Sequence, residues 1–221
     1  MSTEPTTGNL AVVLATRNPG KARELGRLLG GSFNIDVLPA EVEMPAEAGA
    51  TFAENARQKA EAVFDSLGGG FAVLADDSGL EVQALGGAPG VKSARYAGEN
   101  ASDRQNVAKL LAELDEVEDR GARFVCSLCL IIPFADAGAP DCGDYGDRVV
   151  FEVAGSTEGV IELEPRGTEG FGYDPVFRPL GWDETLGESS TECKDAVSHR
   201  GTAARALVDR LRIEGWLPGG S

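Results

Sequence analysis

The chain has 221 residues, of which 42% are hydrophobic, so it is long enough for one sizeable domain with its own core. Its 20 Lys and Arg residues against 36 Asp and Glu residues give a net charge of −16, which repels nucleic-acid backbones and anionic membrane surfaces. We therefore expect neither a nucleic-acid polymer nor a membrane as a partner. No apolar run reaches the length of a membrane span and residues 1–9 are polar, so we expect a cytoplasmic protein with a disordered N-terminal extension over residues 1–9.

The folded region is predicted to begin with a strand, a tight turn and a helix. Leu10–Ala15 is a short apolar run, and Lys21–Leu29 carries apolar residues at helical spacing. Asn18 is suited to the N-cap position, which places Pro19 at the first helical position, where its missing N–H group costs nothing.

The turn between this strand and helix is a candidate anion-binding site. The free N–H groups of the helix start, together with Thr16, Arg17 and Lys21, would converge on one point, most naturally a phosphate. A capped connection with solvated basic residues explains the same stretch equally well. The Walker pattern is not met, because Ala15 and Ala22 stand where it requires Gly and Ser or Thr, and a P-loop ATPase is therefore disfavoured.

A second strand and a second helix are predicted next. Phe33–Leu38 alternates in polarity and indicates a strand, followed by an acidic loop over residues 41–49. Thr51 and Glu54 form a capping box, which opens a helix that ends near Leu67.

Two adjacent acids follow a predicted central strand. Phe71–Ala75 is a continuous apolar run, and we expect the strand to stop at the sequence Asp-Asp-Ser-Gly of residues 76–79. Turn-forming residues alone could explain this sequence. We favour a functional role for Asp76 and Asp77, because ligands of open α/β sheets gather at the carboxyl ends of strands and hard cations prefer carboxylate oxygens.

The second half of the chain completes an α/β pattern with a mixed sheet and two lobes around a cleft. The elements expected there are a short strand over Leu80–Leu85, a helix capped by Ser102, and an antiparallel hairpin of Arg123–Pro133 and Arg148–Ala154 with a loose loop over residues 135–147. Cys126 and Cys129 form a C-x-x-C sequence, but residues three apart in a strand face opposite sides. We expect them to be packing residues and not metal ligands or a redox pair.

Two later stretches carry candidate binding residues. Residues 170–175 place two aromatics and an acid between glycines and a proline, where an exposed ring could stack on a heterocycle, although such rings more often fill a core. Lys194 precedes the last helix, which Ser198 is expected to cap. His199 and Arg200 then lie in its first turn, where cations are unfavourable without an acceptor-rich partner.

Six sequence motifs occur together in one order. They are Ala15–Lys21, Phe52–Ala56 with Lys59, Ala75–Leu80, Gly87–Tyr96, Phe171–Pro175 and Ser198–Gly201. In this combination the chain resembles the Ham1 family of inosine/xanthosine triphosphate pyrophosphatases, from about Leu10 to Leu211. Arg17 stands where that family often has Gly.

The resemblance implies an elongated mixed β-sheet flanked by helices, with two lobes around an active-site cleft. It implies a homodimer that hydrolyses non-standard purine nucleoside triphosphates (ITP, dITP and XTP) to the monophosphate and pyrophosphate with Mg²⁺. We expect a single domain over residues 10–215 and a C-terminal tail over residues 216–221.

The resemblance also implies roles for individual residues. The catalytic group comprises Asp77 as proton acceptor with Lys21 and Lys59, and the metal ligands are Glu47 and Asp77, with Asp76 as a further candidate. The phosphate side comprises Thr16, Arg17, Asn18, Pro19, Gly20, Lys21 and Ser78, and Asn55 is a further substrate-binding residue. The base pocket comprises Phe171, Gly172, Tyr173, Asp174, Lys194, His199 and Arg200.

The chemistry of these residue types agrees with that activity. Donors such as His199 and Arg200 would satisfy the 6-oxo group of inosine or xanthosine but not the 6-amino group of adenine, and an unpaired buried donor costs about 1–3 kcal/mol. The alternatives are a pyrophosphatase acting on modified pyrimidines, dTTP or UTP, and a non-catalytic nucleotide-binding module. An aspartyl phosphatase is disfavoured, because Asp76 and Asp77 lack the D-x-D spacing.

Overall fold

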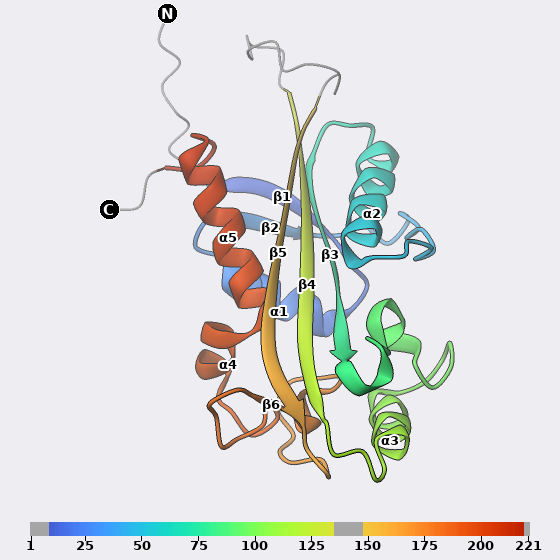
Figure 1. The fold of residues 1–221 in the computed structure, drawn as a ribbon. Coiled ribbons are helices and arrows are strands. Elements are labelled where there is room, and N and C mark those ends of the chain that lie inside the picture. The colour runs from blue at the N-terminus through green and yellow to red at the C-terminus, as the bar shows by residue number, and fades with distance from the viewer. Residues whose placement is uncertain (1–8, 135–147, 219–221) are drawn as a thin grey trace, which may run out of the picture.

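The structure, a computed structural model, describes residues 9–134 and 148–218 (Figure 1). Its strands are β1 (Leu10–Ala15), β2 (Phe33–Val37), β3 (Ala72–Val82), β4 (Gly121–Pro133), β5 (Arg148–Ile161) and β6 (Phe177–Pro179). Its helices are α1 (Pro19–Leu29), α2 (Phe52–Ser66), α3 (Asp103–Glu113), α4 (Thr191–Val197) and α5 (His199–Ile213), with short 3₁₀ turns η1 (Gln83–Leu85), η2 (Gly90–Arg95) and η3 (Asp174–Val176). The loop predicted over residues 135–147 lies outside the described residues.

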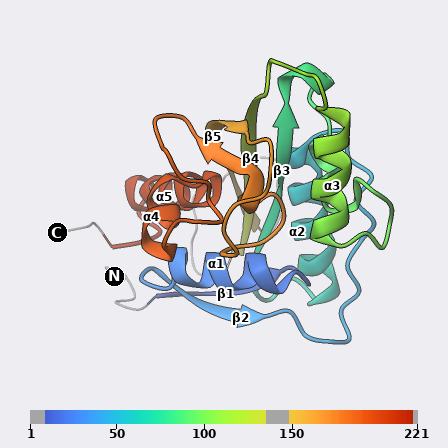
Figure 2. The same ribbon diagram turned by 90° about the horizontal axis from the view of Figure 1, so that it is seen from below.

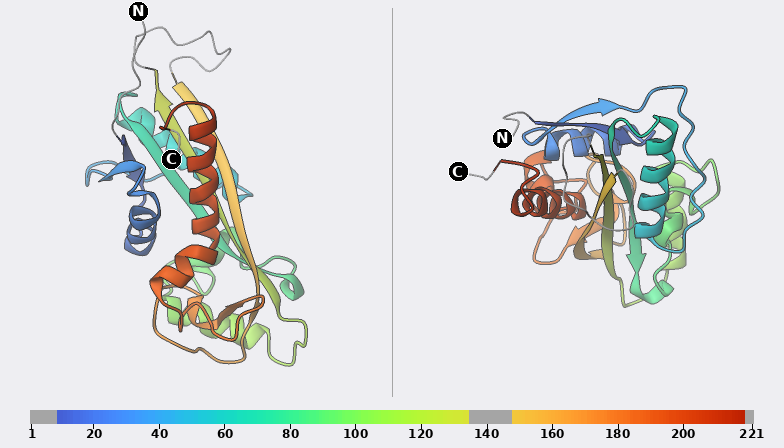
Figure 3. Two further views of the ribbon diagram at one scale, coloured as in Figure 1. Left: turned by 90° about the vertical axis from the view of Figure 1, so that its left-hand side faces the viewer. Right: turned by 90° about the horizontal axis from the view of Figure 1, so that it is seen from above.

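The described strands form one mixed sheet in the order β2-β1-β3-β4-β5-β6. β1 pairs in parallel with β2 and β3, so that α1 and α2 lie on the crossovers between parallel strands. The remaining pairs are antiparallel, and the long β4–β5 hairpin runs along the length of the molecule (Figures 1 and 3). The predicted elongated α/β fold with a mixed sheet is therefore confirmed. No helix in the described residues is long and apolar enough to cross a membrane.

Helices cover both faces of the sheet. Figure 2 shows α4 and α5 on one side of strands β3 to β5, and α2 and α3 on the other. One apolar cluster joins α1 and α5 to the first face, and a second joins α2 to the opposite face. A third cluster, around α3, β6 and the ends of β3 and β4, forms the far lobe. Along β3, Ala75 belongs to the second cluster and Leu80 to the third, so the acidic sequence lies at the junction of the lobes.

β3 runs unbroken through the acidic sequence, so the predicted strand end at Asp76 and the separate strand over Leu80–Leu85 were wrong. Tertiary pairing keeps the strand continuous, because β4 pairs with β3 from Val73 to Val82 and places Asp77 opposite Ser127. β1, by contrast, ends at Ala15, which pairs with Ala75. Asp76 and Asp77 therefore lie just beyond the carboxyl end of β1, the parallel neighbour of β3.

Several elements after residue 154 were not predicted from the sequence. β5 continues to Ile161, and neither α4 nor β6 was expected. Gly155 interrupts the apolar pattern of β5 because a Cβ there would lie 2.4 Å from the His199 carbonyl oxygen, so a glycine is needed for the close approach of α5. Leu217 is buried in the first cluster and Trp216 packs edge-on against Phe151, so the packed chain extends beyond residue 215.

Cys126 and Cys129 are both free and buried, one in the first apolar cluster and the other in the second. They therefore pack on opposite faces of β4, as the strand periodicity predicts.

Candidate active site

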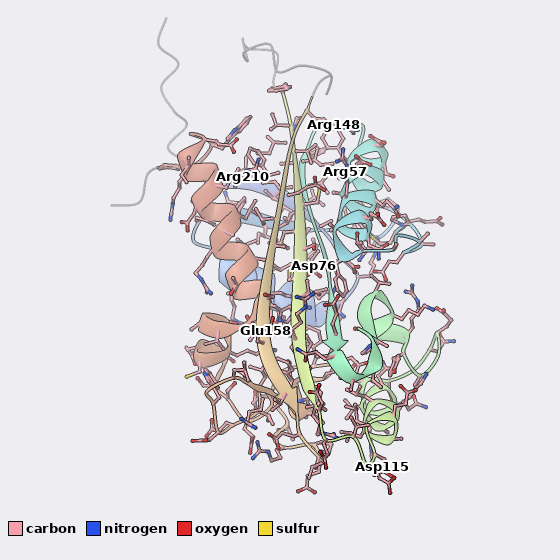
Figure 4. The ribbon with its side chains drawn as sticks, in the orientation of Figure 1. Arg57, Asp76, Asp115, Arg148, Glu158 and Arg210 are labelled. Carbon is pink, nitrogen blue, oxygen red and sulfur yellow. The ribbon has the colours of Figure 1, made fainter. Side chains whose placement is uncertain are left out.

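A cleft of about 680 Å³, including its open mouth, lies between the two lobes. Its lining brings together side chains from both halves of the sequence: Asn18, Lys21, Glu47, Asp77, Ser78, Asp103, Asn106, Phe171, Gly172, Tyr173, Asp174, His199 and Arg200. Figure 4 places Asp76 midway along the molecule, beside the long strands.

The turn before α1 is closed by its own cap. The Asn18 side-chain oxygen accepts hydrogen bonds from the backbone N–H groups of Gly20 (2.8 Å) and Lys21 (3.1 Å), and the Asn18 N–H donates to the Thr16 hydroxyl. Pro19 has no N–H group. The predicted N-cap is confirmed, but the prediction of free helix amides for an anion was wrong, because the cap already satisfies them. The cationic group left at this turn is the Lys21 ammonium.

Asp77 faces α2, where two buried side chains hold its carboxylate. Asn55 donates to Oδ2 (3.0 Å) and Lys59 donates to Oδ1 (2.9 Å). Burial raises the pKa of Asp77, and the charge of Lys59 opposes that rise. The result is an oriented carboxylate that is more basic than an ordinary aspartate, as a proton acceptor requires.

Glu47 shares the Lys59 ammonium with Asp77. Lys59 Nζ lies 2.5 Å from Glu47 Oε1, and Arg95 Nη1 lies 3.0 Å from Glu47 Oε2. Two carboxylates that face one ammonium suit a divalent cation that completes its shell with phosphate oxygens. No cluster of three or more His, Cys, Asp or Glu side chains suited to a metal occurs in the described residues, so Asp77 and Glu47 would offer a cation two carboxylates only.

Asp76 faces the opposite side of β3, toward α1 and α5. Its carboxylate lies 2.5 Å from Lys21 Nζ and 3.5 Å from Arg200 Nε, and the Cys126 thiol donates to it. Burial alone would raise the pKa of Asp76, but Lys21 and Arg200 hold it well below its usual range. Alternation along the strand therefore separates the two neighbouring acids into different charge environments.

A buried network of ion pairs links the two ends of the chain. Lys194 Nζ lies 2.5 Å from both Glu24 Oε1 and Asp174 Oδ2. Arg200 donates to Glu24 Oε2 (2.8 Å) and to the Ser78 hydroxyl (2.7 Å). Glu24 thus holds two cations of the predicted base pocket at once.

The two aromatics of the glycine-rich turn have different surroundings. The half-buried Phe171 ring lies against Gly20, where an added Cβ would be 2.7 Å from the ring. Its centroid is 5.0 Å from the Arg200 guanidinium carbon and 5.2 Å from Lys194 Nζ. Tyr173 is buried in the third apolar cluster and donates its hydroxyl to a backbone carbonyl. Phe171 is therefore the more available ring at the cleft.

His199 is buried and neutral. Its ring stacks on Phe124 with centroids 4.6 Å apart and planes 10° from parallel. Burial, reinforced by Arg200, holds the pKa of His199 well below its ordinary value. Its Nδ1 is buried without a hydrogen-bond partner, so the imidazole keeps unused hydrogen-bonding capacity beside the cleft.

Sequence reasoning missed three residues of the site. Glu24 follows Lys21 by one helical turn, a spacing that places both on one face of α1, but no local pattern shows that the acid is buried. Arg95 belongs to the motif Gly87–Tyr96, but no role was predicted for it. Asp103 accepts a hydrogen bond from the Gly172 backbone N–H (2.7 Å) and so joins α3 to the glycine-rich turn.

Comparisons with known proteins agree on one family. The model of the Ham1 family matches residues 12–210. A dITP/XTP pyrophosphatase of Prochlorococcus marinus is 44% identical over 205 residues, covering 92% of this chain and 95% of that protein. One from Yersinia pseudotuberculosis is 47% identical over 206 residues, covering 91% and 98%. The structure of the Staphylococcus aureus Ham1 protein superposes with a TM-score of 0.76 at 37% identity, covering 92% of this chain and 99% of that one.

Proposed function

The chain belongs to the Ham1 family, and we propose that it hydrolyses non-standard purine nucleoside triphosphates (ITP, dITP and XTP) to the monophosphate and pyrophosphate, which cleanses the nucleotide pool. The observation that carries this proposal is the pair of carboxylates, Asp77 and Glu47, held at one ammonium in a cleft that also contains Phe171 and His199. The relatives named dITP/XTP pyrophosphatases are 44–47% identical over about nine tenths of the chain, which supports the proposal.

In the proposed reaction, water attacks the α-phosphorus and the bond to the bridging oxygen breaks, which releases pyrophosphate. Asp77 orients the water and takes its proton, because its carboxylate is fixed by Asn55 and Lys59. Lys21 and Lys59 offset the charge of the phosphates. Glu47 and Asp77 would hold Mg²⁺, which neutralises further phosphate charge when it is bound. Asp76 is engaged with Lys21 and Arg200 on the other face, so we do not propose it as a ligand.

The base would lie at the other end of the cleft. The Phe171 ring offers a stacking surface, while His199 and Arg200 supply donors for a 6-oxo group. Adenine would leave a donor unpaired, at a cost of about 1–3 kcal/mol. Lys194 and Asp174 support this end of the cleft by their ion pair.

We propose a homodimer in the cytoplasm, with no nucleic-acid polymer or membrane as partner. The net charge of −16 supports the absence of polyanionic partners. Light scattering after size exclusion measures the mass of the assembly.

The test is a panel of ITP, XTP, ATP, GTP and dTTP with Mg²⁺, in which pyrophosphate and phosphate are measured separately. We expect pyrophosphate from ITP and XTP at rates well above those from the other three. Asp77→Asn should lower kcat by about 10²–10⁴-fold while thermal unfolding shows an intact fold. The matched control is Asp115→Asn, an exposed aspartate at the far end of the molecule (Figure 4).

Each other outcome selects an alternative. Preferred turnover of dTTP would indicate the pyrimidine-nucleotide pyrophosphatase, and binding without turnover would indicate a nucleotide-binding module. Unchanged turnover by Asp77→Asn would remove Asp77 as the proton acceptor.

A further inference from the structure

Arg17 lies at the turn before α1, and its guanidinium contacts the backbone of residues 38–42 and does not line the cleft. Nη1 donates to the Leu38 carbonyl (2.9 Å), and Nη2 donates to the carbonyls of Pro39 (2.5 Å) and Val42 (2.6 Å), with Ala40 at 3.3 Å. One side chain thus gathers the carbonyl groups of a tight turn more than 20 residues away. These donors are consumed by the protein itself.

The segment held in this way, residues 38–50, has neither helix nor strand in the described structure. Leu38 and Val42 anchor its start in the apolar cluster beneath α2. Five residues after Val42 the segment carries Glu47, the carboxylate that shares Lys59 with Asp77. The position of Glu47 therefore depends on how this irregular segment is fixed.

The other end of the segment is fixed by two further side chains. Arg95 donates to the backbone carbonyl of Glu47 (3.2 Å) as well as to its carboxylate. Asn55, which holds Asp77, also accepts from the Gly49 N–H (2.8 Å). Arg17 thus clamps the start of the segment, while Arg95 and Asn55 clamp the end next to the carboxylate pair.

We infer that Arg17 is a positioning residue, which orders residues 38–50 and so sets Glu47 for the divalent cation, and that it is not a phosphate contact. This inference rests on the proposed function only where it concerns the cation. Its chemical basis is the planar fork of Arg, whose several N–H donors can bind several carbonyls at once, whereas a Lys ammonium is a point charge that cannot reproduce that geometry.

Two substitutions separate a role in positioning from a role in charge. Arg17→Gln removes the charge and the fork, and Arg17→Lys keeps the charge but removes the fork. A phosphate contact predicts that the Lys variant retains most of the wild-type behaviour. A positioning role predicts that both variants are impaired to nearly the same extent. Arg212→Gln is the matched control, since it removes an arginine from the last turn of α5.

The first measurement is hydrogen–deuterium exchange of the metal-free enzyme, which requires no turnover. We expect the hydrogen-bonded amides of this segment, Val42 and Gly49, to exchange about 10-fold faster in both Arg17 variants than in the wild type, with peptides of α5 unchanged. The Arg212→Gln control should match the wild type throughout. Wild-type exchange of this segment in both Arg17 variants would overturn the inference.

The second measurement is the Mg²⁺ dependence of pyrophosphate release from ITP. In both variants the Mg²⁺ concentration for half-maximal rate should rise about 10-fold, while KM for ITP at saturating Mg²⁺ stays within about 2-fold of the wild type. A wild-type Mg²⁺ dependence together with a raised KM in the Gln variant alone would assign Arg17 to phosphate and overturn the inference. If the wild-type enzyme released no pyrophosphate from any triphosphate, the proposed function would fail, while the exchange experiment would still decide whether Arg17 orders the segment.

Discussion

Replacing Glu24 by Gln tests whether the buried ion pairs hold the site together. Glu24 is 5% exposed and its two carboxylate oxygens bind different cations, Lys194 at 2.5 Å and Arg200 at 2.8 Å. Burial opposes the charge of Glu24, but Arg200 and Lys194 outweigh it and hold the pKa of Glu24 below its ordinary value. The substitution keeps the shape and one acceptor but removes the negative charge between the two cations.

The loss should be large, because two buried cations lose a shared counterion. Breaking a buried ion pair costs about 3–5 kcal/mol, and the remaining amide acceptor recovers part of this. We therefore expect the free energy of unfolding to fall by about 3 kcal/mol, which corresponds to a decrease in Tm of about 6–12 °C for a chain of this size. The kcat/KM for ITP should also fall, since Arg200 is no longer held against Ser78 and the cleft.

Urea unfolding monitored by circular dichroism, together with calorimetry, measures both quantities. Glu61→Gln is the control, because Glu61 forms a partly exposed pair with Arg57 one helical turn away (3.0 Å), and removing it should cost only about 0.3–0.5 kcal/mol. A loss below about 1 kcal/mol for Glu24→Gln, or a loss equal to that of the control, would refute the claim that this network stabilises the fold.

Two further predictions concern pH and the base pocket. The pKa of Glu24 is lower in the folded protein than the unfolded value of 4.5. Its contribution to stability is therefore complete above pH 4.5 and is lost as the pH falls through the folded pKa. In urea unfolding, the difference in the free energy of unfolding between wild type and Glu24→Gln should stay constant from about pH 7 to 5 and shrink below that range. Phe171→Ala should raise KM for ITP about 10-fold with a smaller effect on kcat, because base stacking contributes about 1–3 kcal/mol. Gly20→Ala should act in the same direction, since its Cβ would lie 2.7 Å from the Phe171 ring. Steady-state kinetics with ITP measures both effects, and an unchanged KM in Phe171→Ala would exclude Phe171 from base binding.

The local structure around the cleft was predictable from short sequence patterns. Asn18 with Pro19, the Thr51 and Ser102 capping boxes, and the Ser198 cap all form as expected. Each of these depends on backbone and side-chain groups within three residues of one another, so the pattern carries its own physical cause. The mixed sheet was also predictable, because apolar runs that alternate with helices indicate parallel strands and the hairpin of Arg123–Pro133 and Arg148–Ala154 adds antiparallel ones.

Longer-range features escaped prediction because their causes lie far away in the chain. The sequence at residues 76–79 looks like a turn, and only pairing with β4 makes it continuous strand. The error over the helix amides at the start of α1 has a local cause instead, because the predicted Asn18 cap itself accepts their hydrogen bonds. Arg17 looked like part of a phosphate site, and only the fold shows its contacts with residues 38–42.

The sequence by itself determined the order of most elements, although not α4, β6 or the continuity of β3, as well as the helix caps and the residue types that gather at the cleft. Tertiary structure alone decided how the charges are shared, because a buried charge requires a counter-charge and that partner comes from elsewhere in the fold. Glu24 meets Lys194, which is 170 residues away. The neighbours Asp76 and Asp77 point to opposite faces of one strand, where one joins that ion-pair network and the other faces Lys59 and Glu47.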